Sequence, residues 1–394
     1  MTAAGTTTGI STGTTDGTTD LAIYIHWPFC ERVCPYCDFN VRTAEEVDQV
    51  RWRDAFLREA AHFAAEFPDR TISSIFFGGG TPSLMEADTV AGIISGIREL
   101  WAVSESLEIS IESNVSPAEV KKFEAFGHAG VTRLSLGVQS LDNDALKFLG
   151  REHSAADAIA ALDHGKEVFP MVSIDLIYAR PGQLVQAWQD ELAQALELGP
   201  DHLSLYQLTI EPGTPFAEKK IEPAEEDLAA PLYETTNTVL EAAGLPAYEV
   251  SNHARPGHQC HHNLTYWQGG DYVGLGPGAH GRLTQGQTDA LYQIHTPSRW
   301  LDAVESRNHG TARRTALTEI ERREELIMLG LRRSEGIDAE RFFKLTGRSL
   351  EAALNKNKVD ELLQGGFVVV DQIGLRTTPA GRQRLNAILG HLLT

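Results

Sequence analysis

The sequence predicts an α/β fold in which a partial barrel of parallel strands is followed by a small winged-helix-like domain. Short apolar runs alternate with stretches of helical periodicity over residues 21–250, and this alternation is typical of a parallel sheet. Right-handed crossovers would curl such a sheet, but about six strand–helix units are too few to close the eight-stranded barrel. We therefore expect an open (β/α)6 barrel.

The six expected strands are short and apolar, and they cover residues 21–25, 75–77, 107–111, 134–136, 172–177 and 203–206. Apolar residues at three- and four-residue spacing predict helices between them, among others over residues 45–67 and 184–196. Functional side chains of barrels and open α/β sheets lie at the carboxyl ends of the strands. Polar motifs that directly follow a strand are therefore the candidates for a site.

The flanking segments differ from the barrel in composition. Residues 1–20 are rich in Thr and Gly and lack Lys and Arg, so we expect a disordered tail rather than a signal or transit peptide. Residues 251–318 form a His- and Gly-rich segment that should end in a linker near residues 284–309. Residues 319–394 contain helical runs and two short strands, at 367–370 and 375–377, which indicate the winged-helix-like domain.

Composition limits the possible functions. The chain has 394 residues, 42% of them hydrophobic, which suffices for one large and one small domain. Its 34 basic and 54 acidic side chains give a net charge of -20, which argues against nucleic acid as a partner. Four cysteines make no disulfide framework, and no apolar run approaches the roughly 18 residues of a membrane span. We expect a cytoplasmic protein.

Three of the cysteines, Cys30, Cys34 and Cys37, form a C-x3-C-x2-C run after the first expected strand. Four-iron clusters usually take four cysteine ligands, so three would leave one iron open for an exchangeable ligand. S-adenosylmethionine (SAM) is known to chelate such an iron, and one electron from the cluster can then split its sulfonium bond to give a 5'-deoxyadenosyl radical.

A zinc knuckle and purely structural thiols are the alternative interpretations of the three cysteines. Zinc normally takes a fourth ligand, which His26 could supply. The aromatic Tyr36 between the second and third cysteines and the Asp38-Phe39 pair after the third favour the cluster.

A glycine-rich run, residues 78–82, follows the second expected strand. Gly79, Gly80 and Thr81 would let the backbone approach a ligand closely. A Gly triplet by itself is more often a tight turn, but its place beside the cysteine loop favours binding. Tyr24 on the first strand could pack near an adenine, although a strand tyrosine is by default part of the core.

Polar residues also close the later strands. Glu112 ends the third strand and could contact a nucleoside, or only cap a loop. Gln139 ends the fourth, and Arg151, twelve residues further on, could fork onto a carboxylate. Asp175 lies within an apolar strand, where a carboxylate costs several kcal/mol unless it has a partner.

The stretch Cys260-His261-His262 is the second informative region. Imidazole and thiolate are axial ligands of haem iron and also ligands of zinc. The spacing is not that of a tetrahedral zinc motif, and a generic histidine-rich loop remains the alternative.

On these motifs the chain resembles the radical SAM proteins related to oxygen-independent coproporphyrinogen III oxidase, and within them the haem-chaperone branch. The resemblance extends from Leu21 to the end of the chain. It covers the cysteine loop, residues 78–82, 136–140, 175–178 and 181–183, and the His262-Asn263-x-x-Tyr266-Trp267 motif. The last motif is the most specific marker of the branch.

The resemblance implies a partial (β/α)6 radical SAM barrel, a [4Fe-4S] cluster, SAM and haem. It assigns the cluster to Cys30, Cys34 and Cys37, and haem to His262, with Cys260 and His261 less certain. The implied SAM-binding residues are Tyr24, Gly79, Gly80, Thr81, Glu112, Gln139, Arg151 and Asp175.

Two departures from the family pattern bear on function. The decarboxylases carry a longer ordered segment before the first strand, which helps to bind substrate. Here that region is only the Thr- and Gly-rich tail, and we expect its difference to favour a haem chaperone over coproporphyrinogen oxidation. Ala179-Arg180 replaces the Gly-Leu that often precedes the Pro-Gly-Gln turn, which would add a cation near the site.

The leading hypothesis is a chaperone that passes haem to apoproteins, membrane-bound respiratory proteins among them. The alternatives are an oxygen-independent coproporphyrinogen III oxidase, which uses a 5'-deoxyadenosyl radical, and a haem or metal store with a vestigial cluster. A homodimer and peripheral contact with a membrane are left open.

Overall fold

The computed structural model describes residues 19–43 and 46–393. The expected disordered tail falls almost wholly on residues 1–18, outside the described residues, and Asp20 already begins the first strand. Within the described residues, no helix is both long and apolar enough to cross a membrane.

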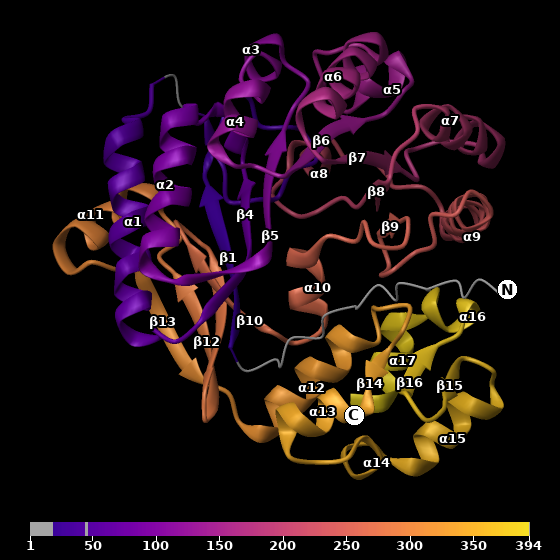
Figure 1. The fold of residues 1–394 in the computed structure, drawn as a ribbon. Helices are drawn as coiled ribbons and strands as arrows, with labels where there is room; N and C mark the ends of the chain where they lie inside the picture. The colour runs from indigo at the N-terminus through magenta and orange to yellow at the C-terminus, as the bar shows by residue number, and fades with distance from the viewer. Residues whose placement is uncertain (1–18, 44–45, 394) are drawn as a thin grey trace, which may run out of the picture.

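A mixed, open sheet of eleven strands organises the larger part of the chain. All six expected strands are confirmed and lie side by side in chain order, each parallel to the next (Figure 1). They are β1 (Asp20–Trp27), β4 (Thr71–Gly79), β5 (Ala102–Ser113), β6 (Arg133–Gln139), β7 (Met171–Tyr178) and β8 (His202–Gln207). Because these strands are parallel, their carboxyl ends share one edge, where the polar motifs meet.

The expected linker near residues 284–309 is wrong. The sheet continues beyond β1 through the parallel strand β10 (Asp271–Leu275) and three antiparallel strands, β11 (His280–Gln285), β12 (Gln287–Gln293) and β13 (Thr311–Ala316), with α11 (Pro297–Arg307) between the last two. Leu283 and Leu291 are buried on one face while the other face carries polar side chains, so each strand offers few apolar residues and its hydrophobic signal is weak. At the opposite end of the sheet, β9 (Asn252–Ala254) pairs antiparallel with β8.

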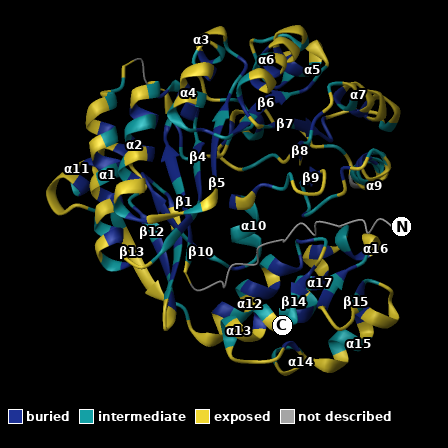
Figure 2. Cartoon of the chain, viewed as in Figure 1, coloured by how far each residue is buried: buried dark blue, intermediate teal, exposed yellow. Residues whose placement is uncertain are grey.

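Helices cover the outer face of the sheet (Figure 1). The larger ones are α1 (Gln49–Glu66), α2 (Ala87–Leu100), α4 (Phe123–Ala129), α6 (Ala155–Val168), α7 (Val185–Glu197) and α9 (Glu226–Ala242). Short elements complete the connections: β2 (Phe29–Cys30), β3 (Arg42–Thr43), η1 (Pro82–Leu84), α3 (Pro117–Val120), α5 (Asn143–Phe148) and α8 (Pro215–Glu218). Figure 2 shows the strands buried and the outward surfaces of these helices exposed, as the apolar spacing of α1 and α7 predicts.

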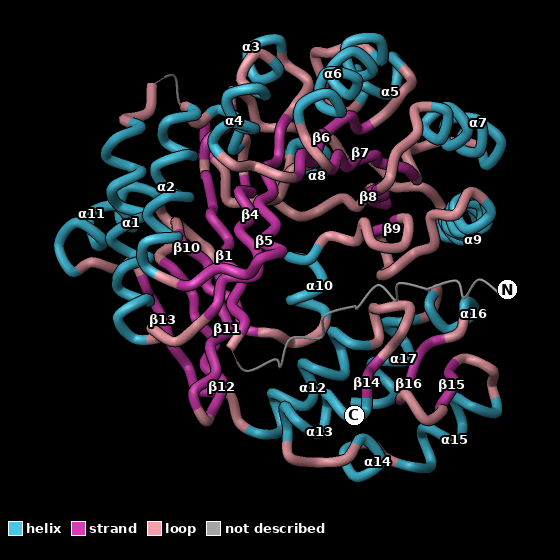
Figure 3. The backbone as a smooth tube through the Cα atoms, in the orientation of Figure 1, coloured by secondary structure: helices cyan, strands magenta, loops and turns pink. Residues whose placement is uncertain are grey.

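One helix lies on the inner face of the sheet. α10 (His261–Trp267) carries the histidine motif, and Figure 3 shows it between the strands and the C-terminal domain. It contacts β4, β10 and α12 (Glu319–Gly330). The histidine motif is therefore part of the barrel interior, not of a surface loop.

The C-terminal domain has a hydrophobic core of its own, which includes Leu331, Phe342 and Leu375. After α12 its elements are β14 (Ile337–Asp338), α13 (Ala339–Thr346), α14 (Leu350–Ala353), α15 (Lys356–Gln364), β15 (Val368–Val370), β16 (Gly374–Thr377), α16 (Pro379–Arg382) and α17 (Leu385–Leu393). The three strands form an antiparallel sheet in the order β14-β16-β15. Helix, strand, helices and a hairpin, followed by α16 and α17, make up the expected winged-helix-like arrangement.

Candidate functional site

A cavity of about 410 Å³ lies at the carboxyl ends of the parallel strands. It is bounded by the cysteine loop after β1 and by the ends of β4 to β8. Ten of the predicted site residues line it: Cys30, Cys34, Cys37, Gly79, Gly80, Thr81, Glu112, Gln139, Arg151 and Asp175. Motifs that are far apart in the sequence thus meet at one site.

The glycine run holds the cysteine loop in place. The Gly80 amide donates to the Trp27 carbonyl at 2.7 Å and the Thr81 amide to the Phe29 carbonyl at 2.8 Å. A Cβ atom on Gly80 would lie 2.6 Å from the Phe29 oxygen and 2.9 Å from the Cys30 sulfur. Gly79 has φ +113°, which a residue with a side chain rarely adopts. These glycines are therefore required for contact between the two loops.

The thiols lie in a partly desolvated setting. Cys30 is buried, while Cys34 and Cys37 are partly exposed. Burial raises the pKa of Cys30 to about 11, although a hydrogen bond with the Thr81 hydroxyl lowers this pKa in part. Burial also raises the pKa of Cys37. The two thiols are thus protonated at neutral pH in the free protein, and metal binding would have to displace their protons.

His26 does not supply a fourth ligand in this structure. Its Nε2 donates to the Asn40 carbonyl at 3.0 Å, and its Nδ1 accepts from the Tyr24 hydroxyl at 3.2 Å. Nor does any group of three or more His, Cys, Asp or Glu among the described residues converge to hold a metal ion. A four-iron cluster takes each thiolate on a different iron, so it does not need the sulfurs to converge on one point.

Two carboxyl groups, Glu112 on β5 and Asp175 on β7, face the inner part of the cavity. Burial, together with the charge of Asp175, raises the pKa of Glu112 to about 8, against a lowering by the Gly79 amide, which donates to it at 3.1 Å. Burial raises the pKa of Asp175 to about 6, because hydroxyls of Ser204, Ser135 and Ser173 offset only part of the cost. The Ser135 hydroxyl donates to Asp175 at 2.9 Å and provides the partner that the buried aspartate requires.

Arg151 connects the cysteine loop to the end of β5. Its guanidinium donates to the Tyr36 hydroxyl at 2.7 Å and to the Asn114 side-chain oxygen at 2.7 Å. Asn114 in turn donates to the Thr81 hydroxyl at 3.0 Å. Asn114 and Tyr36 were not predicted as binding residues, because nothing in their local sequence shows that Arg151 brings them together.

Other cavity residues were also not predicted. Tyr206 and Thr209, at and after the end of β8, line the cavity, as does the exposed Phe39. The signal was present, since Tyr206 closes an expected strand as Glu112 and Gln139 do. Gln139 has φ +68°, an uncommon conformation for a residue with a side chain.

Arg180 does not add a cation to the cavity, so that expectation is wrong. The side chain is buried away from the lining, where it pairs with Glu191 of α7 at 2.6 Å and donates to the Ser140 hydroxyl at 2.6 Å. Glu191 lies between Trp188 and Leu192 of the apolar helix stripe. The sequence pattern therefore does not indicate that this carboxylate is the buried partner of Arg180.

Tyr24 is not among the residues that line the cavity. Its ring lies 6.2 Å from that of Phe76 and 6.3 Å from that of His262, centroid to centroid. It belongs to an aromatic cluster on the inner face, directly behind Gly78, where an added Cβ would lie 2.8 Å from the tyrosine ring. A role of Tyr24 toward SAM stays a prediction.

His262 is buried in the same aromatic cluster, and both of its ring nitrogens have partners. Nδ1 lies 2.9 Å from the Ser74 hydroxyl, and Nε2 bonds to the Tyr266 hydroxyl. Burial lowers the pKa of His262 to about 3, so the ring is neutral. In this conformation the imidazole has no nitrogen available for an iron. His261, in contrast, is exposed.

Cys260 is also buried, and its sulfur lies 3.4 Å from the Glu108 carboxylate. That carboxylate accepts from the His261 amide at 2.9 Å and pairs with Arg133 at 2.9 Å. Burial and the Glu108 charge raise the pKa of the Cys260 thiol. The start of α10 is therefore anchored on β5 and β6 by a buried ion pair.

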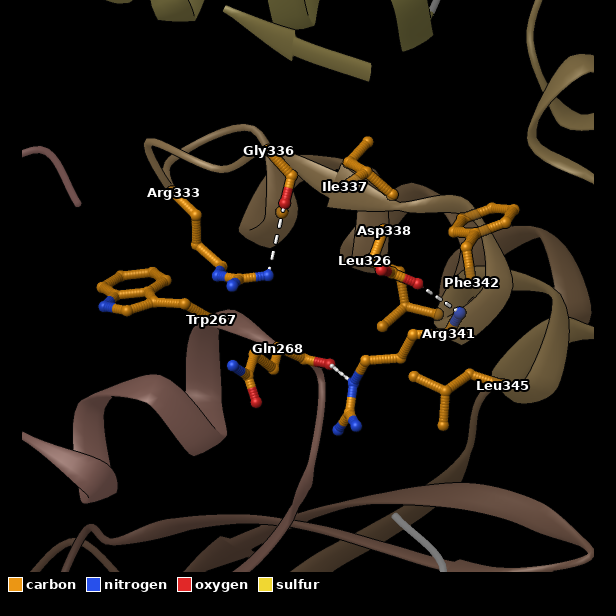
Figure 4. A pocket seen from close by; sticks show the side chains of 11 residues that line it. Trp267, Gln268, Leu326, Arg333, Gly336, Ile337, Asp338, Arg341, Phe342 and Leu345 are labelled. Atoms are coloured by element: carbon orange, nitrogen blue, oxygen red, sulfur yellow. Dashed lines mark hydrogen bonds between the residues drawn. The ribbon is translucent and has the colours of Figure 1, made fainter. Parts of the chain in front are cut away.

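The other end of α10 is anchored on the C-terminal domain. Figure 4 shows this joint, where Arg341 Nε donates to the Gln268 carbonyl at 2.8 Å. Arg322 donates to the Gly269 carbonyl at 2.6 Å, and the Arg332 guanidinium lies 4.6 Å from the Trp267 ring centroid. The helix with the histidine motif thus links the barrel interior to the C-terminal domain.

Known proteins share both parts of this architecture. Residues 24–195 match the radical SAM superfamily, and residues 317–384 match the HemN C-terminal domain. The haem chaperone HemW of Haemophilus influenzae is 34% identical over 382 residues, with 95% of this chain and 98% of that protein covered. The chain belongs to the HemW group of the radical SAM superfamily.

Other similar proteins agree with this family. Radical S-adenosyl methionine domain-containing protein 1, mitochondrial, from Bos taurus is 40% identical, with 95% of this chain and 87% of that protein covered. The solved structure of the coproporphyrinogen III oxidase HemN from Escherichia coli superposes with a TM-score of 0.81 at 23% identity, over 95% of this chain and 90% of that one. At this identity the match shows that the radical SAM fold is shared.

Proposed function

We propose that this protein is a haem chaperone that binds haem, holds a [4Fe-4S] cluster and SAM at the strand-end cavity, and delivers haem to apoproteins. The observation that carries the proposal is the complete set of predicted cluster and SAM residues, Tyr24 excepted, around one cavity in a chain that matches HemW proteins over nearly its whole length. We further propose a cytoplasmic location and recipients that include membrane-bound haem proteins.

The cluster would be held by Cys30, Cys34 and Cys37, and it supplies one-electron reduction of a sulfonium when bound. The residues around it can bind SAM by its separate chemical groups. Arg151, Glu112 and Asp175 line the cavity; in this proposal Arg151 would pair with the carboxylate of SAM, and Glu112 and Asp175 would accept from its ammonium or ribose groups. The glycine run exposes backbone close to the cysteine loop, where the amino-acid part of SAM would lie.

The alternative function is oxidative decarboxylation of coproporphyrinogen III, the activity named for the HemN structure whose fold this chain shares. One assay separates the two. Anaerobically prepared, cluster-loaded protein is given coproporphyrinogen III, SAM and a reductant, and in parallel haem followed by an apo-haem protein. The proposal predicts haem binding and transfer without protoporphyrinogen formation. Protoporphyrinogen formation would replace it by the oxidase function, and absence of haem binding would refute it.

A haem store with a vestigial cluster is tested by the fate of SAM. The proposal predicts that the reduced protein cleaves SAM to 5'-deoxyadenosine at a measurable rate. A protein that binds haem but neither binds nor cleaves SAM would be such a store.

A further inference from the structure

A partly exposed aromatic and cationic patch lies on the inner face of the antiparallel strands. It consists of His280 and Arg282 on β11, Tyr292 on β12 and Arg313 on β13; His280 and Arg313 are exposed, and Arg282 and Tyr292 are partly buried. His280 pairs in register with Tyr292, and Tyr292 with Arg313, so the three side chains share one face. The neighbouring Leu283 and Leu291 point to the other face and are buried in the core.

Tyr292 holds the imidazole and a guanidinium side by side. The His280 ring centroid lies 4.4 Å from the Tyr292 centroid in an edge-on arrangement, and Arg313 Cζ lies 4.1 Å from the same ring. Adjacent strands are about 4.8 Å apart. The backbones of His280 and Arg313 are therefore about 10 Å apart, two strand spacings. Because both side chains contact the same Tyr292 ring, the imidazole and the guanidinium lie closer together than that.

His280 has the properties that His262 lacks in this conformation. It is exposed, and within the described part of the chain no hydrogen bond is found for either ring nitrogen. Desolvation and the charges of Arg282 and Arg313 lower its pKa, so the ring is neutral at pH 7 and can offer a lone pair to a metal.

The charges of the patch are complementary to a carboxylate ligand. Arg282 is already paired with Glu325 of α12 at 2.7 Å. Arg313 is exposed, and among the described residues no carboxylate is found within ion-pair distance of it. A guanidinium of this kind can take an incoming carboxylate in a forked pair.

The patch is connected in space to the histidine motif through Tyr266 and Tyr272. Tyr266 of that motif bonds to His262 on one side, and on the other its ring lies 4.4 Å from that of Tyr272. Tyr272 pairs in register with Arg282. Ring contacts therefore lead from the buried His262 through Tyr266 to Tyr272, and the cross-strand partner of Tyr272, Arg282, belongs to the patch.

We propose that haem docks on this face, with His280 as an axial ligand of the iron and Arg313 paired with a propionate carboxylate. Imidazole is a common axial ligand of haem iron, and the distance between the two groups suits a porphyrin that carries carboxylates at its rim. Tyr292 is a positioning residue that holds both groups. This proposal rests on the proposed function, and it assigns the buried His262 to connecting the patch with the barrel interior.

The test is a haem titration of the full chain followed by absorbance in the Soret region. The proposal predicts that His280→Ala loses the ligand-dependent Soret shift and binds haem more weakly than the wild type. The matched control is His128→Ala on α4, an exposed histidine far from the patch, which should titrate like the wild type. His280 is on the surface, so the variant should fold, and circular dichroism verifies this.

A second variant separates the carboxylate contact from the iron ligand. Arg313→Gln should weaken binding of haem by about tenfold, and with haem dimethyl ester, which has no free carboxylates, Arg313→Gln and the wild type should bind alike. Arg323→Gln, at a partly exposed arginine of α12, is the control.

The outcomes distinguish this proposal from the function on which it rests. A wild-type protein that binds no haem would refute both. A wild type that binds haem, together with a His280→Ala variant of unchanged affinity and Soret maximum, would overturn only the docking face. Equal loss of haem and of its dimethyl ester by Arg313→Gln would overturn the carboxylate contact.

Discussion

Glu108 and Arg133 form a buried ion pair, with Arg133 Nε 2.9 Å from Glu108 Oε2. This pair holds the first turn of α10 in place. Glu108 accepts the His261 amide, and Arg133 donates to the carbonyls of His258 and Gln259. The pair thus fixes the segment with the candidate haem residues against β5 and β6. The first prediction follows from this relationship.

Glu108→Ala should destabilise the protein by about 3–5 kcal/mol, because it leaves a buried guanidinium without its partner. The measurement is chemical unfolding followed by circular dichroism. Glu105→Ala is the matched control, since Glu105 is exposed on the same strand. Equal stabilities of the two variants would show that the pair does not anchor α10.

Gly80→Ala should disturb the cysteine loop, because the added methyl group would contact the Phe29 carbonyl and the Cys30 sulfur. We expect reduced iron per chain after anaerobic reconstitution, with secondary structure intact. Gly390→Ala on α17 serves as control, because nothing lies within 4 Å of its added Cβ. Normal iron content in Gly80→Ala would mean that the loops can separate without cost.

Arg151→Lys should weaken SAM binding by roughly tenfold, because lysine cannot bridge Tyr36 and Asn114 while it also forks onto a carboxylate. Isothermal titration of the cluster-loaded protein measures this effect. The same change at the exposed Arg58 of α1 should have none. Unaltered affinity in Arg151→Lys would remove Arg151 from the SAM site.

Glu112 should make the ligand-free protein less stable as pH rises. Its pKa is raised from 4.5 to about 8, so the folded state retains a proton that the unfolded state loses in this range. The stability from this group is complete below about pH 4.5 and is lost as pH approaches 8. Glu112→Gln should abolish this slope, raise the melting temperature at pH 8 and weaken SAM binding. Parallel pH profiles of variant and wild type would contradict the assignment.

The barrel strands could be predicted because each is a compact apolar run, as in residues 172–177, and the cysteine loop because its spacing is specific. The antiparallel extension could not, because strands such as β13 are almost wholly exposed. Contacts between residues that are distant in the sequence could not be predicted either. Arg180 pairs with Glu191, and Arg151 donates to Tyr36, only because the fold brings these residues together. The sequence likewise did not show that His262 is enclosed.

The most direct test of the account is the metal content and SAM chemistry of anaerobically purified protein. We predict about four iron atoms per chain, a broad iron–sulfur absorbance that Cys30→Ala abolishes, and 5'-deoxyadenosine after addition of SAM and a reductant. Zinc in place of iron, or a cluster that persists in Cys30→Ala, would contradict it.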